Sequence, residues 1–390
     1  MYSYSIHKVD LMKLSCLQEN LSKGLAVVSR AVATRSTLPV TQNVLISTDQ
    51  SRLKLSATNL EIAITTWIGA SIEDEGAITL PARILTEFVN TLEGDKIDFS
   101  LPEGNGILNI SSGRSKATIN GIDAEEFPPI PTVLDGIRAV VNAGVLKKAI
   151  SRVAFAAATE ESRPVLTGVE LKIEGNDFSL AAADGFRLAV QKDKLTEPID
   201  GNIEVIIPAR TMNELNRLVS DDSEEIEVVM TPTRGQILFR SGDIEIVSQL
   251  LQGNFPNYQQ LLPEEHSTRS IFDTNALQRA VRSASIFARD GSNIVRMQLV
   301  PPTEDDDNGK ALISARSEEV GDNEDVVDAE SLEGEESKIA FNSRYLMDVL
   351  AVLDKGNVVL ETTTASSPGV FKPVEDDGYT HVVMPMFVQW

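Results

Sequence analysis

The stretch Leu80-Pro81-Ala82-Arg83-Ile84-Leu85 decides the fold, because it returns in altered form twice further along the chain. Residues 207–212 read Ile-Pro-Ala-Arg-Thr-Met, and residues 341–346 read Phe-Asn-Ser-Arg-Tyr-Leu. The three copies start 127 and 134 residues apart, which is too far for a solenoid repeat and is the length of a whole domain. The repeat predicts three similar domains, and it directs the search for function to a surface rather than to a catalytic pocket.

Other segments recur in the same order around this stretch. In each copy a first helix precedes two strands, and the repeated stretch opens a second, amphipathic helix that runs on through Leu92, Val219 or Leu353. More strands follow, and a proline-marked segment ends each copy. Residues 169–173 and 244–247 alternate apolar and polar side chains, which is the period of a strand with one buried face. Each unit is therefore expected to be an α+β domain, with two helices packed on antiparallel sheets.

Length and turn signals predict the domain boundaries. A chain of 390 residues corresponds to two to four domains of about 150 residues each, and a hydrophobic fraction of 42% supplies a core for each of them. Turn-forming residues at 131–136 and 263–267 separate the patterned segments. The expected division is an N-terminal appendage at 1–11 and domains at 12–134, 135–265 and 266–390.

Cysteine usage and hydropathy predict a cytoplasmic protein. The single cysteine, Cys16, rules out an intrachain disulfide framework and fits a reducing compartment. With Leu14 and Leu17 as neighbours it is interpreted as a small core hydrophobe, and the alternative is a reactive thiol. No run approaches the ~18 apolar residues of a membrane span. Residues 1–11 lack the apolar stretch of a signal peptide, and the first strand is expected to start near Met12.

The residue patterns give little support to an enzyme. The three histidines, His7, His266 and His381, are spread over the appendage, a linker and the last strand. No zinc, redox, nucleophile-elbow or phosphate-loop pattern occurs. Residues 305–309 read Asp-Asp-Asp-Asn-Gly but lack the ligand spacing of a calcium loop, so a solvated hairpin loop is expected there. We therefore expect no catalytic residue, no metal site and no cofactor.

The net charge of −23 is distributed unevenly. The predicted first helices carry +2 over residues 17–35, +3 over 141–159 and +3 over 275–289. All six predicted helices together carry +9, which leaves −32 for the rest of the chain. Helix propensity and solubility alone would favour Glu as often as Lys and Arg, so a basic track for a polyanion is the preferred interpretation. Aromatic residues are not interleaved with the basic ones, which favours non-specific contact with a nucleic-acid duplex.

Seven segments in this order on the repeat carry a resemblance to a known family. They are Thr-Leu-Pro at 37–39, Thr-Asn-Leu-Glu at 58–61, Pro-Ala-Arg at 81–83, Ala-Asp-Gly-Phe-Arg-Leu-Ala-Val at 183–190, Gly-Asn-Phe-Pro-Asn-Tyr at 253–258, Phe-Asn-Ser-Arg-Tyr at 341–345 and Val-Val-Met-Pro-Met at 382–386. With them the chain resembles the bacterial replicative sliding clamp, the β subunit of DNA polymerase III, over about residues 12–386.

The resemblance implies a head-to-tail homodimer in which six domains form a ring around duplex DNA, with helices lining the hole and sheets outside. It implies the polymerase III α subunit, the clamp loader and other proteins with clamp-binding motifs as partners, in the nucleoid and replisome, and no membrane. An enzyme acting on an anionic substrate at the basic face is the alternative. The residues expected to face DNA are Lys23, Arg30, Arg35, Arg83, Lys147, Lys148, Arg152, Arg210, Arg217, Arg279 and Arg282.

The resemblance also implies a dimer seam and a peptide-binding pocket. The seam joins residues 115–120, with Ala117 and Ile119 facing the partner, to Ile286 and Phe287; core packing is the alternative for the last two. Ala117 stands where relatives often have an aromatic residue, and Phe186 stands where histidine is common. The tail at 387–390 either covers the pocket or, as preferred here, extends into solvent. The expected pocket residues are Leu166, Ala183, Gly185, Phe186, Arg187, Leu188, Pro256, Leu261, Asn342, Tyr345, Val382, Met384, Pro385 and Met386.

Overall fold

The computed structural model describes residues 10–390 except 105, 133–134, 161, 221–223, 234, 264, 290–291, 304–307 and 354, with side chains from Met12 onward. Of the predicted appendage, Asp10 and Leu11 are described, and they belong to strand β1 (Asp10–Leu17), which starts two residues before Met12. Most of the expected hairpin loop at 305–309 lies outside the described residues. Within the described part of the chain, no helix is long and apolar enough to cross a membrane.

Strand pairing divides the chain into two compact units, each built from two stretches of sequence. Unit 1 contains Met1–Ala143 and Arg217–Leu250, and unit 2 contains Gly144–Asn216 and Leu251–Trp390. The predicted second domain is shared between them. Its strand β16 (Ile244–Gln249) pairs with β4 (Ile62–Asp74), whereas its strand β12 (Arg187–Lys194) pairs with β25 (Tyr379–Val383). Continuous sheets therefore cross the borders expected from the sequence, and the three-domain boundaries stay a prediction.

Unit 1 is built on one branched antiparallel sheet. Its main path runs β8-β7-β6-β1-β4-β16-β15-β14-β9, and β2, β3 and β5 branch from β4. The thirteen-residue β4 pairs with β1, β3 and β16, so it connects all parts of the sheet. Besides β1, the strands of this sheet are β2 (Asn43–Asp49), β3 (Arg52–Thr58), β4 (Ile62–Asp74), β5 (Ala77–Pro81), β6 (Lys96–Pro102), β7 (Ile107–Ser112), β8 (Ser115–Asn120), β9 (Ile137–Asn142), β14 (Glu225–Met230), β15 (Gln236–Ser241) and β16 (Ile244–Gln249).

Unit 2 holds two antiparallel sheets. One runs β13-β10-β11-β12-β25-β24-β23-β17-β21, and the other runs β20-β19-β18-β22. The strands are β10 (Gly168–Glu174), β11 (Asp177–Ala183), β12 (Arg187–Lys194), β13 (Asn202–Pro208), β17 (Thr268–Asp273), β18 (Ile294–Val300), β19 (Lys310–Ser317), β20 (Gly321–Asp328), β21 (Ser331–Gly334), β22 (Ser337–Asn342), β23 (Asn357–Thr362), β24 (Gly369–Pro373) and β25 (Tyr379–Val383).

The repeated stretch begins a helix in all three places, as predicted. Helices α2 (Ala82–Asn90), α4 (Ala209–Leu218) and α6 (Ser343–Val352) each start directly after a strand ends. In α2, Leu85 and Val89 are buried and Arg83 is exposed, which is the expected amphipathic pattern. In α6, the Asn342 side chain accepts a hydrogen bond from the Arg344 N–H and caps the first turn. The helices end one or two residues earlier than the sequence pattern predicted.

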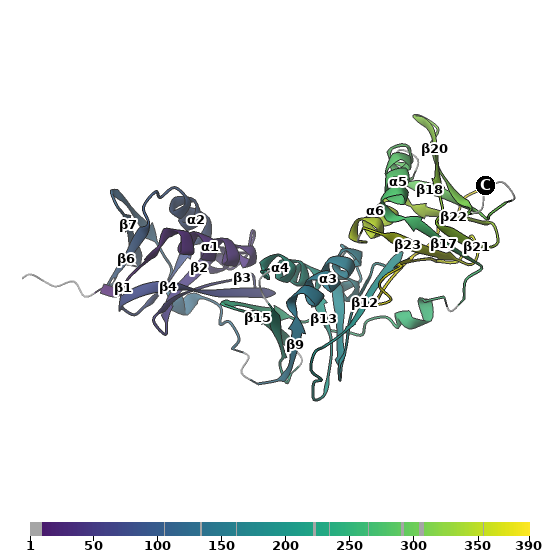
Figure 1. Cartoon of the computed structure of the whole chain (residues 1–390). Coiled ribbons are helices and arrows are strands. Elements are labelled where there is room, and N and C mark those ends of the chain that lie inside the picture. The colour runs from purple at the N-terminus through teal and green to yellow at the C-terminus, as the bar shows by residue number, and fades with distance from the viewer. Residues whose placement is uncertain are drawn as a thin grey trace, which may run out of the picture. The chain divides into compact units, whose positions relative to one another are not determined.

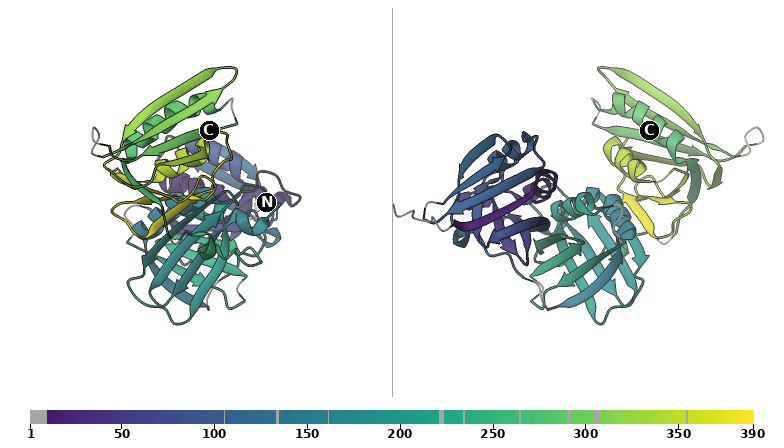
Figure 2. Two further views of the ribbon diagram at one scale, coloured as in Figure 1. Left: turned by 90° about the vertical axis from the view of Figure 1, so that its right-hand side faces the viewer. Right: turned by 60° about the vertical axis from the view of Figure 1, so that its left-hand side comes forward.

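The first helices are shorter than the windows in which their charge was counted. They are α1 (Gln18–Val28), α3 (Ala143–Val153) and α5 (Thr274–Ala288), and 3₁₀ turns follow the first two. In unit 1, α1 packs on α2, β3 and β4, and in unit 2, α5 packs on α6 and on β18 to β20. Figures 1 and 2 show these helices lying against the sheets of their own units. The expectation of paired helices on antiparallel sheets is therefore confirmed.

Candidate functional sites

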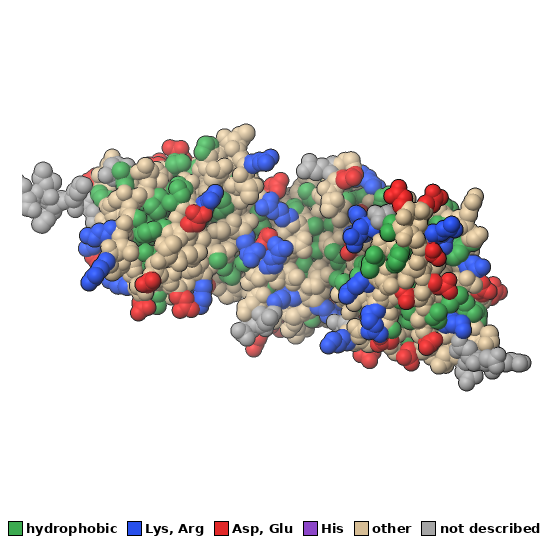
Figure 3. Space-filling view, turned by 90° about the horizontal axis from the view of Figure 1, so that it is seen from above, with side chains coloured by type: hydrophobic (Ala, Val, Ile, Leu, Met, Phe, Trp, Pro, Cys, Tyr) green, Lys and Arg blue, Asp and Glu red, His purple; other side chains and the backbone are tan. Residues whose placement is uncertain are grey.

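Most of the residues expected to face DNA are exposed on or beside the helices. Arg30 lies in the 3₁₀ turn after α1, and Arg35 lies in the loop beyond it. Figure 3 looks down on the molecule from above Figure 1 and shows Lys and Arg side chains together with Asp and Glu. Lys23 forms an ion pair with Glu19 of its own helix, and Arg83 forms one with Glu87 of its own helix. The exposed set is Lys23, Arg30, Arg35, Arg83, Lys148, Arg210, Arg217, Arg279 and Arg282, and Lys147 is half-buried.

The prediction that Arg152 faces DNA is wrong. Its residue surface is only 2% exposed. The guanidinium donates to Asp376 Oδ2 at 2.6 Å and to Gln191 Oε1 at 3.1 Å, and it lies 5.3 Å from the ring centroid of Tyr379. The sequence pattern failed here because Arg152 lies at the end of α3, on the side that packs against β12 and β25 instead of the solvent side.

Arg152 belongs to a buried polar cluster that joins α3 to β12 and β25. Although burial raises the pKa of Asp376, hydrogen bonds from Lys148, Arg152 and the Gly378 N–H outweigh it and lower the pKa to about 2. The Tyr379 hydroxyl donates to the Arg152 carbonyl at 3.0 Å, and burial raises its pKa. Lys148, which was expected to contact DNA, is therefore also a partner of Asp376, at 2.7 Å.

The pocket loop between β11 and β12 is fixed by one carboxylate. Asp184 Oδ1 accepts hydrogen bonds from the Phe186 and Arg187 N–H groups, at 2.8 and 3.0 Å. Gly185 has a φ of +95°, a conformation that disfavours a side chain. A Cβ on Gly185 would lie 2.9 Å from a guanidinium nitrogen of Arg163, which also donates to the Asp184 carbonyl. Arg163 of the same chain therefore lies against the backbone at Gly185, and the sequence analysis did not include it in the pocket.

Arg187, one of the expected pocket residues, bonds to several groups of its own chain. Its Nε donates to Asp184 at 3.0 Å, a terminal nitrogen donates to Asp348, and the other donates to the Phe155 carbonyl at 2.9 Å. The guanidinium also lies 4.7 Å from the ring centroid of Tyr345. Through these contacts Arg187 connects β12 to α6.

An apolar surface surrounds the pocket loop. Leu188 and Val382 pair directly across β12 and β25 and belong to one buried cluster with Tyr258. Phe186 is 57% exposed and stacks on Tyr345, with ring centroids 6.5 Å apart. Of the other predicted pocket residues, Leu166 is buried, Ala183, Asn342, Tyr345, Pro385 and Met386 are half-buried, and Pro256, Leu261 and Met384 are exposed.

A cavity of about 240 Å³ lies beside this surface and adds residues that the sequence analysis missed. It is lined by Phe186, Arg187 and Tyr345 and also by Ala157, Ala158, Thr159, Glu160, Ser162, Arg163 and Asp184. The segment at 157–163 carries no repeat or apolar pattern, so the sequence offered no signal for it. The cavity brings residues of the pocket loop next to Tyr345 of α6, as the resemblance implied.

Two backbone hydrogen bonds hold the segment between β25 and the C-terminal tail. The Met384 N–H donates to the Phe186 carbonyl at 2.8 Å, and the Met386 N–H donates to the Ala340 carbonyl at 2.7 Å. Phe387 is 87% exposed, so its ring covers little. This arrangement agrees with the preferred prediction of a tail that extends into solvent.

Strand β8, expected at the seam, is an open edge of the unit 1 sheet within the described residues. Ala117 is half-buried, but Ile119 is 6% exposed and faces the core of its own unit. The prediction that Ile119 faces a partner is therefore wrong; alternation along β8 places Ile119 on the inner face together with Ala117, which is less covered. At the other predicted side, Ile286 is 60% exposed and Phe287 is half-buried, so Ile286 is not a core residue of this chain.

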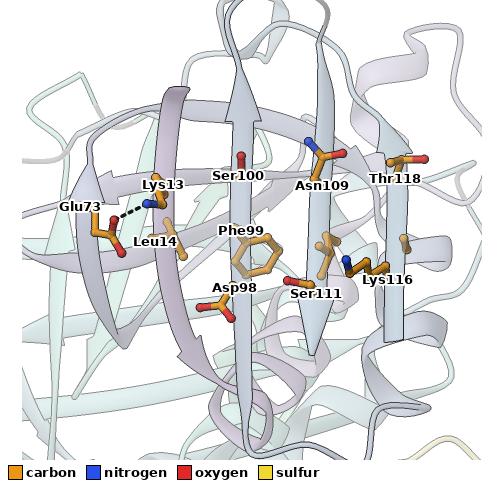
Figure 4. A pocket seen from close by; sticks show the side chains of 12 residues that line it. Lys13, Leu14, Glu73, Asp98, Phe99, Ser100, Asn109, Ser111, Lys116 and Thr118 are labelled. Atoms are coloured by element: carbon orange, nitrogen blue, oxygen red, sulfur yellow. Dashed lines mark ion pairs between the residues drawn. The ribbon is translucent and has the colours of Figure 1, made fainter. Parts of the chain in front are cut away.

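A hollow of about 510 Å³ lies in the unit 1 sheet beside β8. Figure 4 shows side chains from neighbouring strands lining it, including Ser100, Asn109, Lys116 and Thr118. Lys13 pairs with Glu73 at its far side, at 2.6 Å. The lining mixes polar side chains with the apolar residues Leu14, Phe99, Ile110 and Ala117, all from regular strands. No three-residue group that could hold a metal occurs among the described residues.

Cys16 is buried in β1, as the sequence analysis preferred. Burial, and to a smaller extent the nearby Asp98 carboxylate, raise the pKa of its thiol to about 12. A thiol with such a pKa is largely protonated at neutral pH and is a poor nucleophile.

The paired helices, the antiparallel sheets and the open edges define a DNA clamp fold. Models of the DNA polymerase III beta subunit match its N-terminal domain to residues 12–131, its central domain to 140–257 and its C-terminal domain to 259–387. The beta sliding clamp of Synechococcus elongatus is 33% identical over 378 residues, which cover 96% of this chain and 99% of that protein. The beta sliding clamp of Bacillus subtilis is 30% identical over 383 residues, which cover 96% of this chain and 99% of that protein.

Solved structures agree. The crystal structure of the DNA polymerase sliding clamp from Bacillus subtilis superposes with a TM-score of 0.91 at 29% identity, covering 97% of this chain and 100% of that one. A sliding clamp from Pseudomonas aeruginosa superposes with a TM-score of 0.87 at 29% identity, with the same coverage. The chain therefore belongs to the DNA polymerase III beta subunit family, and it is a DNA sliding clamp.

Proposed function

We propose that two copies of this chain join head to tail in a ring that encircles duplex DNA and tethers replication proteins, without doing chemistry itself. The observation that carries the proposal is a pair of open sheet edges with opposite charge, β8 in unit 1 and β20 in unit 2. Arg114 and Lys116 are exposed at β8, and Asp322 and Glu324 are exposed on β20. Antiparallel pairing of β8 from one copy with β20 from the other satisfies both edges.

This contact joins two different surfaces, so repeating it twice closes a ring of two copies. The apolar part of the contact comes from α5, which packs on β20 and presents Ile286 at its end. Val320 and Val326 add exposed side chains beside and on β20. Complementary charge selects the right pair of edges, and the apolar residues stabilise the closed interface.

Duplex DNA is the proposed ligand of the basic helical positions. Because Arg152 is buried, the ten other residues that were predicted to face DNA are the candidates for contact with phosphate. Such contacts carry no sequence information, which is what a protein that moves along DNA requires. The proposed partners at the unit 2 pocket are peptide segments of the polymerase III α subunit, the clamp loader and other proteins with clamp-binding motifs, in the cytoplasm at the replisome.

Analytical ultracentrifugation of a single variant tests the ring. Ile286→Asp places a charge in the proposed interface, at a position that is exposed in the single chain and does not affect its core. The wild type is expected to sediment as a dimer of 42.4 kDa chains and the variant as a monomer. Val374→Asp, at another exposed apolar residue of unit 2, is the matched control and is expected to stay dimeric. An Ile286→Asp variant that is still dimeric at nanomolar concentration shows that the seam lies elsewhere.

A further inference from the structure

A loop in unit 1 repeats the fold of the pocket loop in unit 2. Between β3 and β4, Asn59 Oδ1 accepts hydrogen bonds from the Glu61 and Ile62 N–H groups, at 3.0 and 2.9 Å. Asp184 accepts from the residues at the same two offsets in the pocket loop. Leu60, directly after Asn59, has a φ of +77°, so it adopts the left-handed conformation of the glycine that follows Asp184. A non-glycine residue held in this conformation shows that the surroundings fix the loop.

The strands beside the two loops are paired in the same register. Ala63 of β4 lies opposite Val247 of β16, just as Leu188 of β12 lies opposite Val382 of β25. Each pair belongs to a buried apolar cluster. The two places therefore share a backbone framework, as the internal repeat of the chain requires.

At the end of β16 and just after β25, the backbone makes the same hydrogen bond to the neighbouring loop. The Gln249 N–H donates to the Glu61 carbonyl at 2.8 Å, and the Met384 N–H donates to the Phe186 carbonyl at 2.8 Å. Gln249 thus occupies the place of Met384, and Glu61 occupies the place of Phe186. The framework is kept while two apolar side chains are replaced by polar ones.

A hollow of about 230 Å³ lies at this place in unit 1. Leu60, Glu61 and Gln249 line it together with the segment at 128–131, whose Ile130 packs against the cluster that contains Ala63 and Val247. That segment reads Pro-Pro-Ile-Pro, so only its isoleucine can donate a backbone hydrogen bond, and its fixed dihedral angles give the hollow a stiff wall. Leu60 is 53% exposed beside an apolar floor, which leaves apolar surface for a ligand.

We propose that this hollow is a second peptide-binding site, which takes a short extended segment carrying an apolar side chain next to Lys or Arg. The apolar side chain enters over Ala63 and Val247, and the cation meets the exposed Glu61 carboxylate. The side-chain amides of Gln236 and Gln249 can each donate to and accept from the peptide main chain. The inference goes beyond the proposed function but rests on it, because the unit 2 pocket supplies the comparison.

The charge at this place defines the occupant. Glu61 stands where the other pocket has an aromatic ring, and Ile62 stands where Arg187 connects β12 to α6. Two more acidic residues, Glu125 and Glu126, are exposed just before the proline segment begins. A cationic peptide is therefore attracted to this site, and an acidic one is repelled.

The experiment measures the binding of two fluorescein-labelled peptides to the full-length protein by anisotropy. The first is acetyl-Ser-Leu-Lys-Leu-Pro-amide, and the second has Glu in place of Lys. Each is titrated with the wild type and with Glu61→Lys, Glu197→Lys and Met384→Ala. Glu61 and Glu197 are both exposed, so the first two variants make the same charge change in different units.

The proposal expects the Lys peptide to bind the wild type and Glu197→Lys alike and to bind Glu61→Lys about fivefold more weakly, since one exposed ion pair changes from attraction to repulsion. Met384→Ala reports how much of the binding takes place at the unit 2 pocket. It also expects the Glu peptide to bind the wild type more weakly than the Lys peptide does. Equal binding of the Lys peptide by Glu61→Lys, or binding that only Met384→Ala abolishes, overturns the second site and leaves the ring and the unit 2 pocket untouched. No binding of the Lys peptide to the wild type overturns it as well.

Discussion

Arg152→Met is expected to lower the stability of unit 2 and to leave contact with DNA unchanged. The substitution keeps most of the apolar volume of the buried stem but removes the guanidinium from Asp376, Gln191 and Tyr379. Breaking a buried ion pair costs about 3–5 kcal/mol, and the lower end applies because Asp376 is partly exposed and keeps Lys148 as a partner. A loss of about 3 kcal/mol in a unit of this size corresponds to a fall in Tm of about 6–12 °C.

Calorimetry and urea unfolding measure this loss, and pH adds an independent check. The folded pKa of Asp376, about 2, is below its ordinary value of 3.8, so its carboxylate contributes stability that is complete above about pH 5 and is lost as pH falls toward 2. Arg152→Met is expected to reduce this acid dependence, and the exposed control Arg210→Met is expected to keep it. If Arg152→Met unfolds like the wild type and instead weakens DNA binding, Arg152 reaches outward and the assignment of the buried cluster is refuted.

Two further outcomes concern the ligands. Charge reversal at Arg35, Arg279 or Arg282 is expected to weaken duplex binding, with the log–log salt slope falling by ~0.9 for each lost phosphate contact; a footprint that depends on base sequence contradicts this reasoning. Met384→Ala is expected to weaken the binding of a polymerase tail peptide by ~1–3 kcal/mol. Deletion of residues 387–390 is expected to leave this binding unchanged, because Phe387 is exposed. Calorimetric titration measures both effects, and full-strength binding by Met384→Ala refutes the assignment of the pocket.

The helices and strands could be predicted because the same order of segments occurs three times in the sequence. A short stretch such as residues 80–85 is weak evidence when it occurs once, but its return at 207–212 and 341–346 in the same surroundings shows that one backbone is reused. The start of the second helix in each copy follows from this repeat. The length of the first helices does not follow from the repeat. Helix α1 ends at Val28 and a 3₁₀ turn begins at Ser29, and no proline or glycine marks this end.

Burial was the part that the sequence could not determine. Arg152 and Arg187 look like surface cations, yet each neutralises carboxylates from elements far away in the sequence, Asp376 for one and Asp348 for the other. Ile119 was predicted to lie at the interface, but its side chain packs into the core of its own unit. Each outcome depends on which face of an element meets another sheet, and this is set by strand pairing that periodicity does not encode. The outer strands of the predicted second domain joined different units for the same reason.

Several of the basic side chains on the helices have acidic partners close by. At physiological ionic strength the Debye length is about 8 Å, so DNA at the helices responds to nearby charges more than to the total of −23. Lys23, Arg83 and Lys148 already have carboxylate partners at 2.6 to 2.8 Å. A phosphate group therefore exchanges one anion for another at these positions and gains little. If these residues contact DNA as proposed, several weak contacts of this kind hold a duplex without fixing it at one site, which is the behaviour that sliding requires.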